Sequence, residues 1–287
     1  MEFNLVIPKT KSELLVAMRT NKNYRFAAGC TDLLMELKKN AIEGLTVINL
    51  VQVNDQQLTG MKYSAKGLRM GAMSTAHHVG INNEIEKHFP VLKQAALNLA
   101  STQIRQVATI GGNICTASPS GDISCALVAL NCNCEIINTS GDIRIVPIQK
   151  FFTGPRQTSL KKNEMLYGVI IPPNDKNTND NFSGFVKIGT RQSMECSVVS
   201  LAYHIQTDKT GKILHAGIAI GSSAPTIKIA TKAGDFLIGK TFKLLTEKEK
   251  QTFAEYVLTY AAPITDLRAT AWYRKEVLFN ISKSIFE

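Results

Sequence analysis

The chain has 287 residues, of which 44% are hydrophobic and 20% are charged. This length exceeds what one hydrophobic core usually organises, so two or three packed subdomains are expected, and the balanced composition argues against a disordered or fibrous protein. The net charge of +10 favours an anionic ligand over a nucleic acid, because lysines and arginines are scattered and no basic run is longer than two residues, as at Lys38-Lys39 and Lys161-Lys162.

No targeting segment is recognisable at the start of the chain. Residues 1–8 lack a basic stretch followed by an apolar stretch, and no window reaches 18 consecutive apolar residues. A cytoplasmic protein with no membrane partner is therefore expected. Thiols stay reduced in that compartment, so the six cysteines are expected to be free, and Cys132-x-Cys134 is interpreted as part of a core rather than as a metal site.

The first 55 residues alternate short strands and helices. Apolar periodicity predicts strands at residues 3–7, 24–28 and 46–50, and helices at residues 11–19 and 31–39. These elements predict a first α/β subdomain that covers residues 1–55.

A second subdomain is expected at residues 56–173. Antiparallel strands are predicted at residues 58–64 and 67–72, helical segments up to residue 100, and a helix at residues 122–130, where apolar residues recur at helical spacing. Further strands are predicted at residues 134–138, 143–146 and 164–171.

Residues 174–181 are polar and turn-forming, and they mark the clearest boundary in the chain. A third domain is therefore expected at residues 182–287. It has predicted strands at residues 182–188, 197–207 and 212–220, and predicted helices at residues 226–238, 247–260 and 269–281. This order predicts a sheet covered by helices on one side, and the fold class of the whole chain is α+β.

Two glycine-bearing loops carry the chemistry. The first, residues 27–32 (Ala-Ala-Gly-Cys-Thr-Asp), links a predicted strand to a predicted helix, so free N–H groups at the helix start point outwards. The second, residues 109–113 (Thr-Ile-Gly-Gly-Asn), has paired glycines that permit positive φ and let N–H groups converge on an anion. Side-chain donors are added by Thr109, Asn113 and Ser118. A pyrophosphate suits such loops, although the glycines taken alone favour simple turns.

The loop sequences resemble those of one protein family. Ala-Ala-Gly-Cys-Thr-Asp-Leu-Leu at residues 27–34 and Ala-Thr-Ile-Gly-Gly-Asn-Ile-Cys-Thr-Ala-Ser-Pro-Ser-Gly-Asp at residues 108–122 resemble the FAD-binding loops of the flavoprotein (medium) subunit of molybdenum hydroxylases, such as xanthine dehydrogenase and carbon monoxide dehydrogenase. The likeness continues at residues 185–191 and 265–274. It implies two α/β FAD-binding subdomains of the vanillyl-alcohol-oxidase (PCMH) type, followed by a sheet-plus-helices domain.

The resemblance also implies which residues bind FAD. Leu99 and Leu166 fall at apolar positions near the flavin, and Lys187 falls at a polar contact to it. Compared with many relatives, the first loop has a bulkier thiol at the phosphate turn, and Leu99 replaces an aromatic residue found in some of them. The predicted contacts along the two loops are Ala28, Gly29, Cys30, Thr31 and Asp32, then Thr109, Ile110, Gly111, Gly112 and Asn113, and further on Ser118 and Asp122.

An electron-transfer subunit is the implied function. A large partner chain would hold the molybdopterin cofactor and a small partner chain two [2Fe-2S] clusters, while FAD on this chain would pass electrons to NAD+ or another acceptor. Flavin suits this position because it accepts electrons singly and releases a pair as hydride. No catalytic residue and no metal ligand is assigned to this chain.

Two other functions stay open: a self-sufficient FAD-dependent reductase or oxidase on the same fold, and a non-catalytic binding module that has lost its flavin. Cys30 in the phosphate loop supports the second of these. Residues 234–241 match the P-loop pattern G-x-x-x-x-G-K-[ST], but a P-loop precedes a helix, whereas these residues overlap the end of one. Gly239 is therefore interpreted as the residue that ends that helix.

Overall fold

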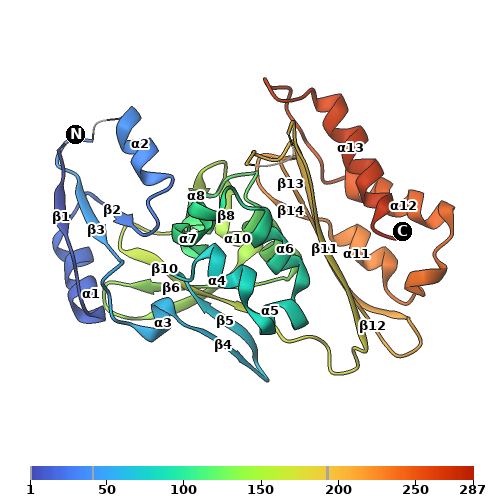
Figure 1. Ribbon diagram of the computed structural model, residues 1–287, viewed down its shortest axis with the longest axis horizontal. Helices are drawn as coiled ribbons and strands as arrows, with labels where there is room; N and C mark the ends of the chain where they lie inside the picture. Colours follow the sequence, from blue (N-terminus) through green and yellow to red (C-terminus); the bar gives the residue numbers. More distant parts are fainter. Residues whose placement is uncertain (1, 41, 192–193) are drawn as a thin grey trace.

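The computed structural model describes residues 2–40, 42–191 and 194–287. Three larger sheets follow one another along the molecule, with the N-terminal sheet at one end, the C-terminal sheet at the other, and a helix-rich subdomain between them (Figure 1). The α+β class predicted from the sequence is confirmed.

The N-terminal subdomain is a three-stranded parallel sheet in the order β1 (Asn4–Val6), β3 (Thr46–Asn49) and β2 (Tyr24–Ala27). Its helices are α1 (Lys11–Thr20) and α2 (Leu33–Lys39). All five predicted elements are confirmed. The second helix begins two residues later than predicted, so the first glycine-bearing loop extends over residues 28–32.

The middle subdomain holds an antiparallel sheet in the order β4-β5-β10-β6-β7. The predicted strand at residues 58–64 is wrong in its first half. Asp55 accepts a hydrogen bond from the Gln57 N–H and begins a short helix, which buries Leu58. The strands are β4 (Met61–Ser64), β5 (Gly67–Gly71), β6 (Asn133–Asn138), β7 (Ile143–Pro147) and β10 (Glu164–Ile171).

Helices cover this middle sheet, and three of them, α7 (Thr102–Val107), α8 (Ile110–Thr116) and α10 (Ile148–Phe151), lie in stretches where none was predicted. A small hairpin of β8 (Phe152–Gly154) and β9 (Gln157–Thr158) follows them. The helices are α3 (Gln56–Thr59), α4 (Ala76–Ile81), α5 (Asn83–His88), α6 (Pro90–Asn98), α7 (Thr102–Val107), α8 (Ile110–Thr116), α9 (Asp122–Ala129) and α10 (Ile148–Phe151).

The C-terminal domain is an antiparallel sheet in the order β11-β12-β13-β14, with three helices and a 3-10 turn. The helix predicted at residues 226–238 is wrong in its first part, because residues 228–229 pair with β13 as a short strand. The elements are β11 (Asp180–Ile188), β12 (Val199–Thr207), β13 (Ile213–Gly221), β14 (Lys228–Ile229), α11 (Thr231–Leu237), η1 (Phe242–Leu244), α12 (Glu247–Leu258) and α13 (Ala271–Ser284).

Helices cover this C-terminal sheet on both faces, so the prediction of one covered face is wrong. In β12, Leu201 belongs to a core shared with α11–α13, whereas the next residue, Ala202, belongs to the core of the middle subdomain, which includes α6 and α9. Small residues line the second face: a Cβ on Gly217 would lie 1.9 Å from the Ala129 carbonyl oxygen at the end of α9. The middle subdomain and the C-terminal sheet are thus closely joined.

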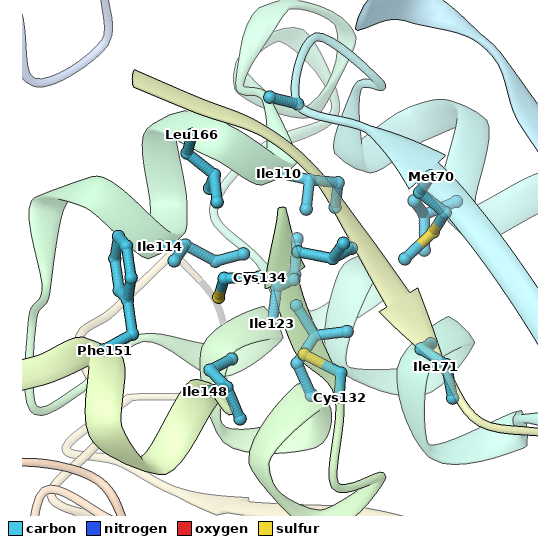
Figure 2. Packing of buried hydrophobic residues seen from close by; sticks show 14 of the residues in the cluster. Met70, Ile110, Ile114, Ile123, Cys132, Cys134, Ile148, Phe151, Leu166 and Ile171 are labelled. Carbon is cyan, nitrogen blue, oxygen red and sulfur yellow. The ribbon is translucent and has the colours of Figure 1, made fainter. Parts of the chain in front are cut away.

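The largest core lies between the middle sheet and its helices (Figure 2). Cys132 and Cys134 are fully buried in it, so their interpretation as core residues is confirmed. All six cysteines are free thiols. None of the helices in the described part of the chain is long and apolar enough to span a membrane.

Candidate cofactor site

The two predicted loops lie against each other. A Cβ added to Gly29 would lie 2.0 Å from the carbonyl oxygen of Val107, the residue that ends α7 just before the second loop. A second contact joins the same segments, because the Thr116 hydroxyl at the end of α8 donates to Asp32 Oδ2 at 2.8 Å. The fold thus brings distant segments together, since the two residues of this second contact are 84 positions apart in the sequence.

The first loop presents unpaired backbone donors. Within residues 2–40, 42–191 and 194–287, the N–H groups of residues 28–32 donate to no backbone or side-chain acceptor. Residues 28–31 are half-buried, and residue 32 is exposed. Successive N–H groups without partners form a concave anion site, and the following helix adds a favourable dipole. This loop therefore fits the pyrophosphate of a dinucleotide.

Cys30 adopts the conformation that usually requires glycine. Its φ is +58°, in the left-handed region where a side chain is strained by about 1–2 kcal/mol. The thiol lies 3.7 Å from the Ala28 carbonyl oxygen, and burial raises its pKa, so it adds no negative charge beside an anion. The thiol is thus compatible with a phosphate in this loop.

The second loop differs from its prediction. Residues 110–113 form the first turn of α8, and neither glycine has a positive φ. Their N–H groups are already used: Ile110 donates to Ser74 O, Gly111 to Ala72 O and Gly112 to Thr109 Oγ1, while the Asn113 N–H bonds to Thr109 O. The expectation that these N–H groups converge on an anion is therefore wrong.

Close packing explains the first of the paired glycines instead. A Cβ on Gly111 would lie 2.8 Å from the Ala72 carbonyl oxygen, which closes that side of the helix. Gly112 faces outward and is exposed, and its nearest neighbour would be Thr109 Oγ1 at 3.0 Å. The second segment thus presents a surface without a projecting side chain, at Gly112, next to the N–H donors of the first loop.

The three predicted side-chain donors of the second segment serve local structure. Thr109 caps α8 through its hydroxyl. Asn113 Oδ1 accepts hydrogen bonds from the N–H and hydroxyl of Ser124, which ties α8 to α9. The Ser118 hydroxyl lies 3.0 Å from that of Ser120 and accepts the Ser120 N–H. Their predicted contacts to a cofactor remain predictions.

Asp122 and Lys187 form a pair at the junction with the C-terminal domain. Lys187 Nζ on β11 lies 2.6 Å from Asp122 Oδ2 at the start of α9, and it also donates to the Asn98 carbonyl oxygen at 3.2 Å. Burial raises the pKa of Asp122 to about 6, although the Lys187 charge and hydrogen bond oppose this shift. The sequence predicted both residues as cofactor contacts, but it gave no sign that they contact each other.

The raised pKa of Asp122 makes stability depend on pH. Between its ordinary value of 3.8 and about 6, the folded chain holds a proton on Asp122 that the unfolded chain releases. This contribution is fully present below 3.8 and is lost as the pH rises through about 6. We expect the melting temperature of the native chain, relative to that of Asp122→Asn, to increase as the pH is lowered from about 7.5 to about 5. Thermal melts at the two pH values test this, and a constant difference would contradict it.

Leu99 and Leu166 differ in exposure. Leu99 follows the last residue of α6 and is half-buried, whereas Leu166 is 4% exposed and packs in the core with Ile114 of α8 (Figure 2).

Arg105 was not predicted from the sequence. Its Nη1 donates to the carbonyls of residues 99 and 100, both at 2.9 Å, and so fixes the turn that carries Leu99. No sequence spacing distinguishes such an arginine from an exposed one.

Other candidate features lie away from these loops. A cavity of about 590 Å³, lined by Tyr63, His88 and Asn174 among others, includes none of the predicted cofactor residues. No group of three metal-ligating side chains that could hold a metal ion occurs among the described residues.

The P-loop pattern at residues 234–241 does not form a P-loop. Gly239 has a φ of +83° two residues after the end of α11, so its interpretation as the glycine that ends this helix is confirmed.

Solved structures share the whole fold. The chain matches one from reconstituted CO dehydrogenase of Oligotropha carboxidovorans with a TM-score of 0.90 at 22% identity, covering 99% of this chain and 96% of the other. It also matches one from quinoline 2-oxidoreductase of Pseudomonas putida with a TM-score of 0.88 at 23% identity, covering 100% and 96%. The FAD-binding fold with a C-terminal domain is therefore confirmed.

Two relatives of known sequence align over nearly their full lengths. The "Xanthine dehydrogenase FAD-binding subunit" of Escherichia coli is 28% identical over 277 residues, which cover 96% of this chain and 92% of the relative. The "Glyceraldehyde dehydrogenase medium chain" of Sulfolobus acidocaldarius is 27% identical, with coverage of 100% and 98%.

Two family models divide the chain between them. The model described as "FAD binding domain in molybdopterin dehydrogenase" matches residues 1–174, and the "CO dehydrogenase flavoprotein C-terminal domain" matches residues 185–287. The first model alone spans more than half of the chain. The chain therefore belongs to the FAD-binding family of the molybdopterin dehydrogenases and is an oxidoreductase subunit of the xanthine dehydrogenase and CO dehydrogenase type.

Proposed function

We propose that this subunit holds FAD with its pyrophosphate on the first loop and carries electrons between partner chains and a terminal acceptor. The observation that carries the proposal is the run of unpaired N–H groups at residues 28–32, placed against the second segment by the close packing of Gly29. The flavin ring supplies the coupling of one-electron to two-electron transfer when bound. The chain itself binds and orients the cofactor.

The proposed partners are a molybdopterin-binding large subunit and a small subunit with [2Fe-2S] clusters, in a cytoplasmic complex. Relatives named as a subunit or a medium chain support an assembly of several chains. Exposed apolar side chains beside the second segment also support it, since such surfaces commonly mark protein interfaces. These side chains are Ile81, Leu97, Ile104 and Val107 on α4, α6 and α7. We further propose NAD+ or another carrier as the acceptor.

The proposed domains are residues 1–55, 56–173 and 182–287. The three sheets support this division, because each domain contains one of them. β11 begins at Asp180, inside the polar segment that separates the last two domains.

The purified full chain tests the proposed cofactor site. We expect bound flavin absorption bands and saturation at one FAD per chain on titration. A colourless chain that shows no affinity for FAD would contradict the proposal.

The same measurement on Cys30→Gly addresses the non-catalytic alternative. If the thiol in the phosphate turn excludes FAD, only the variant will bind it, whereas we expect both proteins to bind. Turnover of a reduced nicotinamide with a small substrate by the isolated chain would favour the self-sufficient flavoenzyme. Co-purification of a tagged chain with molybdenum, iron and sulfide would favour the subunit.

A further inference from the structure

The free edge of β1 lies at the outer end of the molecule (Figure 1). β1 pairs with β3 on its other side, where the Asn4 N–H donates to the Leu45 carbonyl oxygen. Backbone groups of successive strand residues point to opposite sides, so those of Phe3, Leu5 and Ile7 point away from β3. They have no hydrogen-bond partner in the described part of the chain. The edge of β1 is therefore a row of unpaired backbone donors and acceptors.

The side chains of the same three residues form an exposed apolar row. Phe3 is 40% exposed, Leu5 54% and Ile7 41%, and their alternation places them on one face of the sheet. Leu5 lies beside Val47 of β3, which packs with Leu37 of α2. The short helix α2 thus covers the neighbouring strand on this face and leaves the side chains of β1 uncovered.

The other outer strands carry features that prevent pairing between edges, namely charged side chains, prolines, very short strands or a covering helix. Helix α6 packs against β11, where Gln94 Oε1 accepts the Phe185 N–H. Residues 3–7 have none of these features. An edge of this kind is expected to be paired in the working protein. The features of the remaining outer strands are Arg25 in β2, Lys62 in β4, Pro147 in β7, and Lys228 in the two-residue strand β14.

A second copy of this chain fits the edge of β1. When two β1 strands pair antiparallel about a two-fold axis at Leu5, Phe3 of each copy lies opposite Ile7 of the other. Every outward backbone group of these residues then gains a partner, and the two apolar rows meet on one face. The charges at the ends match as well, because this register brings Glu2 of one copy next to Lys9 of the other.

We propose that two copies of this chain associate through their β1 strands, so that their three-stranded sheets become one continuous sheet. The contact is isologous, since both copies use the same residues. This inference goes beyond the proposed function and does not depend on it, because the pairing of β1 requires no FAD.

Sedimentation equilibrium of the full chain over a range of concentrations tests this inference, and we expect the native chain to dimerise. Leu5→Lys places two ammonium groups opposite each other and removes two apolar side chains, so it is expected to weaken the dimer about 100-fold. Leu5→Pro removes an outward N–H that has no partner within one chain. It is expected to weaken the dimer about tenfold and to leave the fold intact, because an edge strand accepts proline at such a position.

A matched control and a second measurement locate the contact. Leu244→Lys adds the same charge at a leucine of the C-terminal domain that is 76% exposed, and it should dimerise as the native chain does. Hydrogen exchange of the Leu5 amide should be slow in the dimer and should become fast on dilution. If Leu5→Lys does not fold, Leu5→Pro and this amide decide.

Three results would overturn the inference. One is a native chain that stays monomeric at every concentration, and another is a dimer that is equally stable in all the variants. The third is a Leu5 amide that becomes protected only when a different protein chain is added, since the edge of β1 would then pair with that chain instead of with a second copy.

Discussion

Replacement of Gly29 by alanine is expected to abolish tight FAD binding and to destabilise the fold. The new Cβ would lie 2.0 Å from the Val107 carbonyl oxygen and 2.7 Å from its carbonyl carbon, so the backbone of one segment must move. Overpacking that forces such a backbone shift typically costs about 1–3 kcal/mol. The move also takes the N–H donors of residues 28–32 away from the second segment. Loss of two hydrogen bonds to a charged group, about 3 kcal/mol together, weakens binding about 100-fold.

FAD titration and thermal melting of the Gly29→Ala chain measure the two effects. Gly154→Ala is the matched control, because its Cβ would first meet the flexible end of the Gln157 side chain, at 3.0 Å. Gly154 lies in β8, outside the two loops. Normal FAD affinity in Gly29→Ala would show that the two segments do not form one site.

Arg274→Met is expected to destabilise the C-terminal domain strongly. The Arg274 side chain is 4% exposed, and its Nη2 lies 2.8 Å from Asp266 Oδ1. Its Nη1 donates to the carbonyls of Val198 and Ser222, at the ends of two neighbouring strands. Removing Arg274 leaves these two carbonyl oxygens unsatisfied and also removes the ion pair with the half-exposed Asp266, and together these losses cost about 3–5 kcal/mol. For a chain of this size we expect a fall in melting temperature of about 6–20 °C.

A neighbouring arginine provides the control for this prediction. Arg268 also faces Asp266, but at 3.7 Å and with 54% of its side chain exposed. Exposed pairs contribute about 0–1 kcal/mol, so Arg268→Met should melt within about 2–4 °C of the native chain. Equal losses in the two variants would show that Arg274 does not act through its buried contacts.

Local patterns determined most of the secondary structure. Alternation and helical spacing predicted the first five elements, and strand-to-helix turns predicted the place of the first loop. Two of the failures came where distant segments decided the outcome. Residues 228–229 carry helical spacing but pair with β13, and the second face of the C-terminal sheet is covered by helices from an earlier part of the chain.

For the candidate site too, the sequence predicted some features and only the tertiary structure revealed others. The sequence by itself predicted two glycine-bearing segments as the candidate site, and their resemblance to a family named the cofactor. Only the tertiary structure decided which segment has free donors, because Ser74 and Ala72 use those of the second. It also paired Asp122 with Lys187, 65 residues apart. The physical reason is that periodicity records which side of an element faces a core, whereas hydrogen-bond partners and close backbone contacts depend on how distant elements meet.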